Sequence, residues 1–242
     1  MRVDACMLAL TFLAAASGVT PAVAQRAEPE ARPQPWRIGV ALVGAQPRGD
    51  FGHVLDRAAW GGTLNGSYRL DAAGIFALRA DAGILNYGRE ERRVMLSPTV
   101  GGRIQLDLRT TNDVAFFHVG PEIALPLGPV RPYAALGLGV IHLATNSALS
   151  STESSDSFAR TTHLSDWTRS LVGAAGLRAP VYRGRSQIAV DAGVRYQNNG
   201  EARYLREGDI TDNPDGTISF TPHRTDTDML VMQLGVSIVP GR

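Results

Sequence analysis

Apolar and polar residues alternate along most of the chain from Trp36 onward. In the stretch RVMLSPTVGGRIQLDLR, residues 93–109, every second residue from Val94 to Leu108 is apolar or small, and the residues between them are mostly polar or charged. A period of two places successive side chains on opposite faces of an extended strand. The pattern therefore predicts an all-β chain whose strands have one apolar and one polar face.

Nine segments share this alternation, and each is close to the roughly 9–11 residues that a tilted strand needs to cross a bilayer. They are residues 36–46, 60–70, 75–87, 93–109, 114–125, 131–144, 168–179, 187–197 and 228–239. A closed bacterial barrel has an even number of strands. Pro98 and Pro121 lie in two of the segments, and paired strand interiors disfavour proline. Either one segment is not a full crossing, which gives eight strands, or a further strand is hidden, which gives ten. We favour eight.

The connections between the segments are of two kinds. The short ones are residues 70–74, 109–113 and 182–185, and the long polar ones are residues 145–166 and 198–226. Within the last, Asn213-Pro214-Asp215-Gly216 is a turn signal that predicts a hairpin. Short turns at one end and long loops at the other are typical of a single antiparallel up-and-down transmembrane barrel, with the long loops outside the cell.

Aromatic residues are expected at both ends of these strands, where interfacial girdles form in a membrane barrel. Those at the short-turn end are Trp36, Tyr68, Tyr133 and Tyr182. Those at the long-loop end are Trp60, Tyr87, Trp167 and Tyr196.

The polar faces of the strands carry charges of both signs. We expect these side chains to face the lumen and to pair there as a structural network: Arg69, Arg79, Asp81, Arg103, Asp107, Glu122, Asp191 and Arg195. Balanced charges would pair and fill a small barrel, whereas a selective pore has one dominant sign. The apolar faces are rich in Ala, Gly and Val, which suits lipid better than a thick packed core. A soluble secreted sheet or lipocalin-like barrel, with the apolar faces inside, remains the alternative.

The N-terminus has the pattern of a secretory signal peptide. Arg2 precedes an apolar stretch, and Ala22-Val23-Ala24 precedes Gln25, so residues 1–24 are predicted to be removed and the mature chain to start near Gln25. Residues 25–35 form a Pro-rich periplasmic linker, and residues 36–239 form the barrel, which places the chain in the outer membrane. The single cysteine, Cys6, lies within the predicted signal, so the mature chain has no disulfide.

Charge gives no sign of a nucleic-acid partner. The formal net charge is only +1, and no run of basic residues occurs. The mean hydropathy of −0.07 and the lack of long apolar runs after the first two dozen residues argue against membrane-spanning helices.

Three short sequences resemble the small outer-membrane barrels of the OmpA, OmpX, OmpW and opacity-protein kind. They are Tyr68-Arg69-Leu70 before a turn, Leu78-Arg79-Ala80-Asp81, and Gly128-Pro129-Val130-Arg131-Pro132-Tyr133 before Gly137-Leu138-Gly139. The resemblance covers about residues 36–239. It implies contact with outer-membrane lipid and lipopolysaccharide, insertion by the barrel-assembly machinery with periplasmic chaperones, and a monomer. The chain departs from these barrels at its end, where Val239 is followed by Pro240-Gly241-Arg242 rather than by a terminal aromatic.

Catalytic patterns are weak. His163-Leu164-Ser165-Asp166 matches the His-x-Ser pair of lipid A deacylase barrels, in which a base activates serine. His223, Asp226 and Asp228 resemble part of the omptin protease site but lack its second acidic pair. We therefore expect no catalytic residues and a structural or surface-interaction role, with a barrel enzyme as the alternative.

Metal and cofactor sites are also not expected. His53, His118 and His142 are isolated, without metal-ligand spacing. Asp209, Asp212 and Asp215 do not fit a helix–loop–helix calcium loop.

Overall fold

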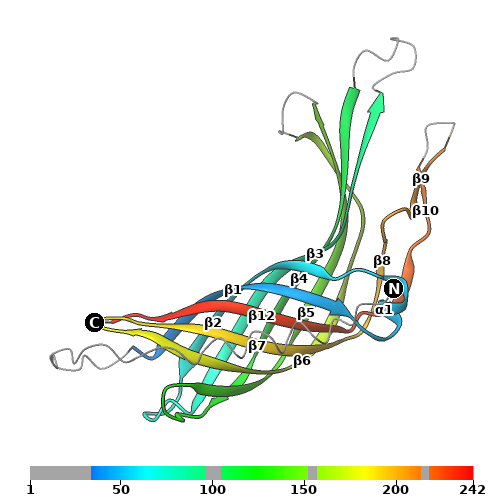
Figure 1. The fold of residues 1–242 in the computed structure, drawn as a ribbon. Coiled ribbons are helices and arrows are strands. Elements are labelled where there is room, and N and C mark those ends of the chain that lie inside the picture. Colours follow the sequence, from blue (N-terminus) through cyan, green and yellow to red (C-terminus); the bar gives the residue numbers. More distant parts are fainter. Residues whose placement is uncertain (1–33, 96–104, 152–156, 214–217, 242) are drawn as a thin grey trace, which may run out of the picture. The chain divides into compact units, whose positions relative to one another are not determined.

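The computed structural model describes residues 34–95, 105–151, 157–213 and 218–241. Eight of its strands form one closed antiparallel barrel, in the order β1-β12-β7-β6-β5-β4-β3-β2 (Figure 1). These strands are β1 (Trp36–Pro47), β2 (Ala59–Arg69), β3 (Phe76–Met95), β4 (Gln105–Ala124), β5 (Arg131–Ser151), β6 (Ser157–Arg183), β7 (Gln187–Asn199) and β12 (Met229–Val239). Strand β1 pairs with both β2 and β12, so no barrel edge is left open. The prediction of an eight-stranded barrel is confirmed.

The segment 93–109 is not a separate crossing. Its first residues extend β3 and its last residues begin β4, and these two strands pair from Phe76–Ile123 to Met95–Gln105. The turn predicted at residues 109–113 was wrong, because these residues lie inside β4, with Arg109 opposite Glu91. Nine segments thus become eight strands. Pro121 is accommodated where the β4–β5 pairing passes from Val119–Leu138 to Glu122–Ala135, which spares its missing N–H.

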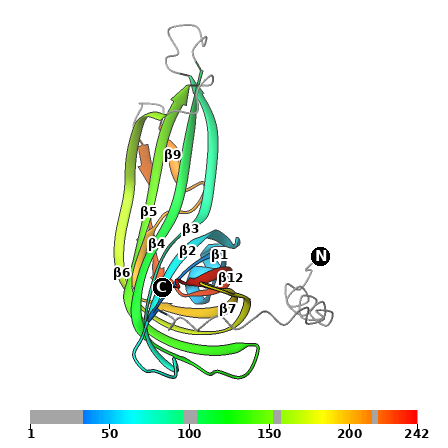
Figure 2. The same ribbon diagram turned by 90° about the vertical axis from the view of Figure 1, so that its left-hand side faces the viewer.

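Strands β3 to β6 run well past the other four (Figure 2). The loop predicted at 145–166 was wrong, because β5 and β6 stay paired as far as Ser150–Ser157. We call residues 88–95, 105–112, 145–151 and 157–165 the four-stranded extension. The predicted signal peptide, most of the linker, Arg103 and Pro98 lie outside the described residues.

The stretch 198–226 is folded rather than irregular. Strand β8 (Glu201–Tyr204) pairs with β11 (His223–Asp226), and β9 (Ile210–Asp212) pairs with β10 (Ile218–Phe220). The second pair is the hairpin that the turn signal predicts. Between β1 and β2 lies a short helix that the alternation did not predict, α1 (Gly49–Val54). Among the described residues, no helix is long and apolar enough to span a membrane.

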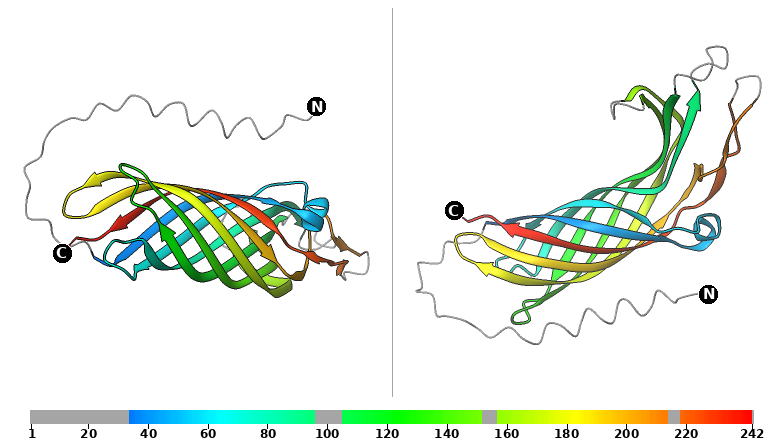
Figure 3. Two further views of the ribbon diagram at one scale, coloured as in Figure 1. Left: turned by 90° about the horizontal axis from the view of Figure 1, so that it is seen from below. Right: turned by 45° about the horizontal axis from the view of Figure 1, so that its top comes forward.

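The outward faces of the barrel strands are apolar, and we call this surface the apolar belt. Its large members are Trp36, Ile38, Val40, Leu42, Trp60, Leu64, Tyr68, Phe76, Leu78, Ile84, Phe117, Val119, Ile123, Leu136, Leu138, Val140, Trp167, Leu171, Leu177, Val190, Val194, Tyr196, Met232, Leu234, Val236 and Ile238, all exposed. They come from all eight strands, which wind around the barrel at a tilt (Figure 3). The apolar faces of the strands therefore point outward, and their polar faces point into the barrel.

The barrel interior has two layers. Near α1 it is an apolar core, in which Phe51 of α1 packs edge-on against Tyr87 and Tyr204. Nearer the short turns it is polar and charged. The expectation of a polar lumen thus holds near the short turns but not near α1, where apolar side chains fill the interior together with residues of α1 and β8.

Candidate functional site: the polar interior

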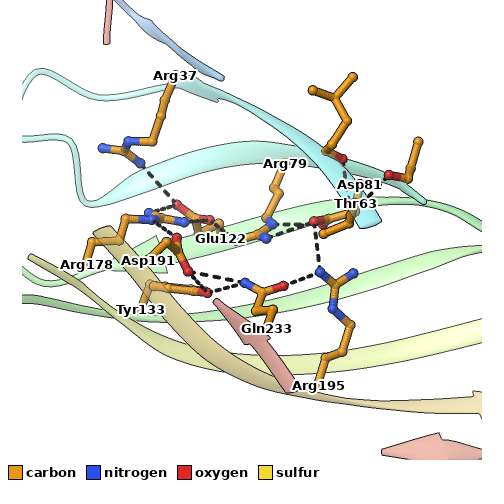
Figure 4. Close-up of polar contacts among 12 residues, drawn as sticks. Arg37, Thr63, Arg79, Asp81, Glu122, Tyr133, Arg178, Asp191, Arg195 and Gln233 are labelled. Atoms are coloured by element: carbon orange, nitrogen blue, oxygen red, sulfur yellow. Dashed lines mark hydrogen bonds and ion pairs between the residues drawn. The ribbon is translucent and has the colours of Figure 1, made fainter. Parts of the chain in front are cut away.

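Inward-pointing charges from five strands, β1, β3, β4, β6 and β7, meet in one network (Figure 4). Arg79 and Asp81 lie two residues apart on β3, so both face inward, and Arg79 donates to both Asp81 oxygens at 2.8 Å. Glu122 on β4 and Arg178 on β6 reach the same space from the neighbouring strands. Strand alternation therefore builds the site by giving each strand one or two inward charges.

Glu122 joins the largest number of arginines. It accepts two hydrogen bonds from Arg178, both at 2.6 Å, and one from Arg79 at 3.0 Å. The Arg37 guanidinium of β1 lies 3.7 Å from its Oε1 atom. Two-point guanidinium contacts are among the stronger hydrogen-bonded pairs in proteins. This one carboxylate thus connects β1, β3, β4 and β6 through the lumen.

Asp191 on β7 forms a second centre. It accepts from Arg178 Nε at 2.9 Å, from the Tyr133 hydroxyl at 2.8 Å and from the Gln233 amide at 3.2 Å. The Arg178 guanidinium also lies over the Tyr133 ring, 4.0 Å from its centroid. Asp191 is almost fully buried, so these donors replace the water that its charge would otherwise need.

Arg195 closes the network. It donates to the Gln233 side-chain oxygen, and its guanidinium lies 3.6 Å from Asp81. The contacts therefore form a ring. It runs from Asp81 through Arg79, Glu122, Arg178, Asp191, Gln233 and Arg195, and the last of these returns to Asp81. Every carboxylate in this ring is held by arginine, an arrangement suited to cross-linking strands rather than to acid–base chemistry.

Glycine makes room for the inward Tyr133 side chain. A Cβ atom on Gly176 or Gly193 would come within 2.5 Å or 2.7 Å of its hydroxyl oxygen. Nearby, His118 Nε2 lies 2.7 Å from the Ser170 hydroxyl, and the cavity beside Arg79, His118 and Arg195 is only about 10 Å³. That is room for about one water, so side chains fill this part of the lumen.

The structure brings five of the eight predicted network residues together: Arg79, Asp81, Glu122, Asp191 and Arg195. Arg69 lies apart, at the short-turn end, where it donates to the Gln34 carbonyl. Asp107 was wrongly placed in the lumen. It lies in the four-stranded extension, half-exposed and 3.4 Å from Arg93. The cause is that β4 has left the barrel at this point.

Sequence reasoning missed Arg37, Tyr133, Arg178 and Gln233 as network members. Arg178 and Gln233 were detectable, because each follows or precedes an outward apolar residue, Leu177 or Leu234, and alternation therefore points it inward. Which of these side chains touch one another depends on register across strands far apart in sequence, and no local pattern gives that.

Six of the eight predicted girdle aromatics point outward: Trp36, Trp60, Tyr68, Trp167, Tyr182 and Tyr196. Tyr133 and Tyr87 were wrongly assigned, since both are buried in the interior. Tyr133 belongs to the charge network. Tyr87 lies next to the β3 irregularity at Asn86–Gly88, packs on Phe51 and donates to the Leu205 carbonyl.

Side chains from both weak catalytic patterns have other partners in the structure. Asp166 accepts from the Arg203 backbone N–H at 2.9 Å, and this bond, with that from Trp167, lowers the pKa of Asp166. Its neighbour Ser165 is exposed on the other face of the strand. His223 pairs with Asp209 at 3.0 Å, while Asp228 accepts from Tyr196 and Asn199. These contacts give Asp166, His223 and Asp228 partners within the fold.

The chain matches no protein-family model and no curated protein sequence. Among solved structures it is similar to Neisserial surface protein A, with 12% identity and a TM-score of 0.46 over 85% of this chain and 97% of that one. It is also similar to the attachment invasion locus protein of Yersinia pestis, solved with the heparin analogue sucrose octasulfate, at 17% identity and a TM-score of 0.43 over 84% and 96%. A major outer membrane protein of Thermus thermophilus has 15% identity and a TM-score of 0.38 over 83% and 98%. Similarity at this level transfers no function to the chain.

Proposed function

We propose that this protein is a non-catalytic barrel of the bacterial outer membrane, with a filled lumen and a surface-interaction role for its four-stranded extension. The observation that supports this most directly is the apolar belt. Leu42, Ile84 and Leu138 are 79%, 67% and 67% exposed, and similar side chains follow on every barrel strand. Soluble proteins rarely expose an apolar patch beyond a few hundred Å². A belt that surrounds the barrel is compatible with lipid and costly in water.

The outer face of the extension is charged, and this supports an end of the membrane-spanning part where the extension begins. Arg109 lies on the same face of β4 as Phe117, so the face changes from apolar to charged along one strand. There Glu91 accepts from Arg89 at 2.6 Å and from Arg109 at 2.9 Å, and these hydrogen bonds lower its pKa. Exposed ion pairs of this kind suit water. We therefore assign the extension to the aqueous side, beyond the long-loop end.

The two interior layers support a structural rather than a channel role. The arginine–carboxylate ring crosses the lumen nearer the short turns, and the core around Phe51 fills the end near α1. A wide channel would need both layers to be absent. The recognition that we propose thus belongs to the extension and to β8–β11, not to the lumen.

Cysteine labelling on intact cells tests location and orientation together. The only natural cysteine is Cys6, in the predicted leader, so single introduced cysteines are selective. We expect a membrane-impermeant maleimide to label Thr162→Cys, exposed in the extension, without treatment of the cells. The matched Ala73→Cys, exposed in the β2–β3 turn, should be labelled only after the outer membrane is permeabilised.

Labelling of Ala73→Cys but not Thr162→Cys on intact cells would reverse the orientation. Recovery of both variants in the soluble periplasmic fraction would overturn the membrane proposal itself.

A further inference from the structure

The short-turn mouth of the barrel gathers four arginines, and the charge network pairs only two of them with carboxylates. Arg37 (β1), Arg131 (β5), and Arg178 and Arg183 (β6) line one cavity of about 80 Å³, which we call the arginine mouth. No acidic residue of the described chain lines it. Its volume is several times the roughly 10–15 Å³ that one water needs. The cavity thus has room for a small ion and a strongly positive wall.

Only part of this charge is paired. Arg178 is held by Glu122 and Asp191, and Arg37 lies 3.7 Å from the same Glu122. For Arg131 and Arg183, no carboxylate in the described part of the chain lies within ion-pair distance. Arg131 instead experiences electrostatic repulsion from Arg183 and Arg178. Like charges gathered in this way are unfavourable unless an anion lies between them.

A strand irregularity directs one of these arginines inward. The β6–β7 register shifts between Pro180 and Tyr182, so Val181 and Tyr182 both point outward and Arg183 falls opposite Gln187 at the mouth. Uninterrupted alternation would have turned Arg183 toward the belt with Leu177. Bulges commonly re-aim a side chain in this way.

A buried hydroxyl without a partner points to the same cavity. Ser237 on β12 is 3% exposed, lines the cavity, and its Oγ atom has no hydrogen-bond partner among the described residues. Buried hydroxyls nearly always have a partner, so an orphan one requires an explanation. A bound oxyanion would accept a hydrogen bond from the Ser237 hydroxyl.

We propose that the arginine mouth binds a phosphate group. Guanidinium groups bind tetrahedral oxyanions through paired N–H donors, and a multiply charged oxyanion offsets several arginines at once. The phosphate belongs either to a free phosphate compound or to the headgroup of an anionic phospholipid. This site lies at the opposite end from the extension and goes beyond the proposed function, because it requires no surface partner.

Titration calorimetry with inorganic phosphate tests the site on the full chain folded in octyl glucoside, a detergent without phosphate. We expect saturable one-to-one binding. Arg183→Gln and Arg131→Gln should each weaken it at least about tenfold, because each removes a charge-assisted hydrogen bond. Arg183→Lys should restore part of the affinity, and Ser237→Ala should weaken binding a few-fold. The matched control, Arg224→Gln on β11, removes an equal charge from an exposed arginine at the other end and should change nothing.

Adding phosphatidylglycerol to the micelles separates the two sources. Displacement of inorganic phosphate identifies a lipid headgroup, as does binding of the lipid alone, and binding of phosphate without displacement identifies a free phosphate compound. Heat-modifiable migration on a gel checks that each variant is folded. The proposal is overturned if neither probe binds saturably, or if folded Arg183→Gln and Arg131→Gln bind as tightly as Arg224→Gln.

Discussion

At the scale of single residues, Glu122 is the side chain on which the interior depends most. It is 1% exposed and accepts three hydrogen bonds from Arg79 and Arg178. Replacing a buried ion pair by apolar groups can be neutral, but removing one partner leaves an uncompensated charge. Here two guanidinium groups would each lose one of their two carboxylate partners, Arg79 keeping Asp81 and Arg178 keeping Asp191.

We therefore expect Glu122→Ala to lower the free energy of unfolding by roughly 3–5 kcal/mol. Denaturant unfolding in lipid vesicles measures this, with fluorescence from the outward-facing Trp36, Trp60 and Trp167 as the signal. Glu91→Ala is the matched control, because Glu91 also pairs with two arginines but at the surface, and its loss should have a much smaller effect on the free energy of unfolding. Equal effects of the two variants would show that burial does not set the value of Glu122.

The sequence was sufficient to turn most charged residues toward the correct side. Alternation alone directs Arg79, Asp81 and Arg195 inward, and the structure places them there. It could not identify Tyr133 as a lumen residue, because an aromatic near a strand end looks like a girdle residue. The space for its ring comes from Gly176 and Gly193 on two other strands, which is information about packing rather than about local pattern.

At the scale of elements, strand ends were the features least predictable from sequence. Thr110-Thr111-Asn112-Asp113 has the composition of a turn, yet it continues β4. Polar residues appear there because β4 leaves the apolar belt, so its outer face becomes hydrophilic at Asp107, Arg109 and Thr111 while its pairing with β3 and β5 continues. Polarity marks a change of surroundings as well as a change of direction, and sequence cannot separate the two. The Asn-Pro-Asp-Gly signal was more specific, because proline and glycine restrict the backbone itself.

Asp166 ties β8 to β6 through Arg203, and this contact gives an element-scale prediction with a pH dependence. Hydrogen bonds hold the pKa of the Asp166 carboxyl below its usual value near 3.8. The bond from the Arg203 backbone N–H contributes most, and the Trp167 backbone N–H and the Arg203 side chain add to it. Because the folded pKa is the lower one, this contact stabilises the fold above the unfolded pKa and is lost as pH falls through the folded pKa. We expect the Arg203 amide resonance to titrate with a midpoint below 3.8.

Asp166→Asn should abolish that titration of the Arg203 amide. The matched variant Asp226→Asn, at an exposed position on β11, should leave it unchanged. A midpoint at or above the usual aspartate value would contradict a hydrogen bond from Arg203 to the ionised carboxylate.

At the scale of the whole molecule, the closed barrel, its filled interior and its apolar belt are explained together. Closure removes the edges of the barrel sheet, so the backbone groups of its strands pair with one another, as a bilayer would require. Inside the barrel, the charge ring pairs the buried carboxylates with arginines, and the apolar core fills the end near α1. Stability without a disulfide follows from this combination. The belt has no interior function and is explained only by what surrounds the barrel.

The surroundings can be tested by placing one charge on the belt. Leu138 lies in the middle of the barrel portion of β5, opposite Leu171 and Val119, and is 67% exposed. In lipid, Leu138→Arg should cost roughly 2–4 kcal/mol of unfolding free energy, as arginine does near a bilayer midplane. Ser150→Arg, on the same strand but in the extension, should cost less than about 0.5 kcal/mol. Denaturant titration in vesicles measures both. If the barrel were soluble, with water around the belt, both substitutions would be nearly neutral, and the membrane proposal would fail.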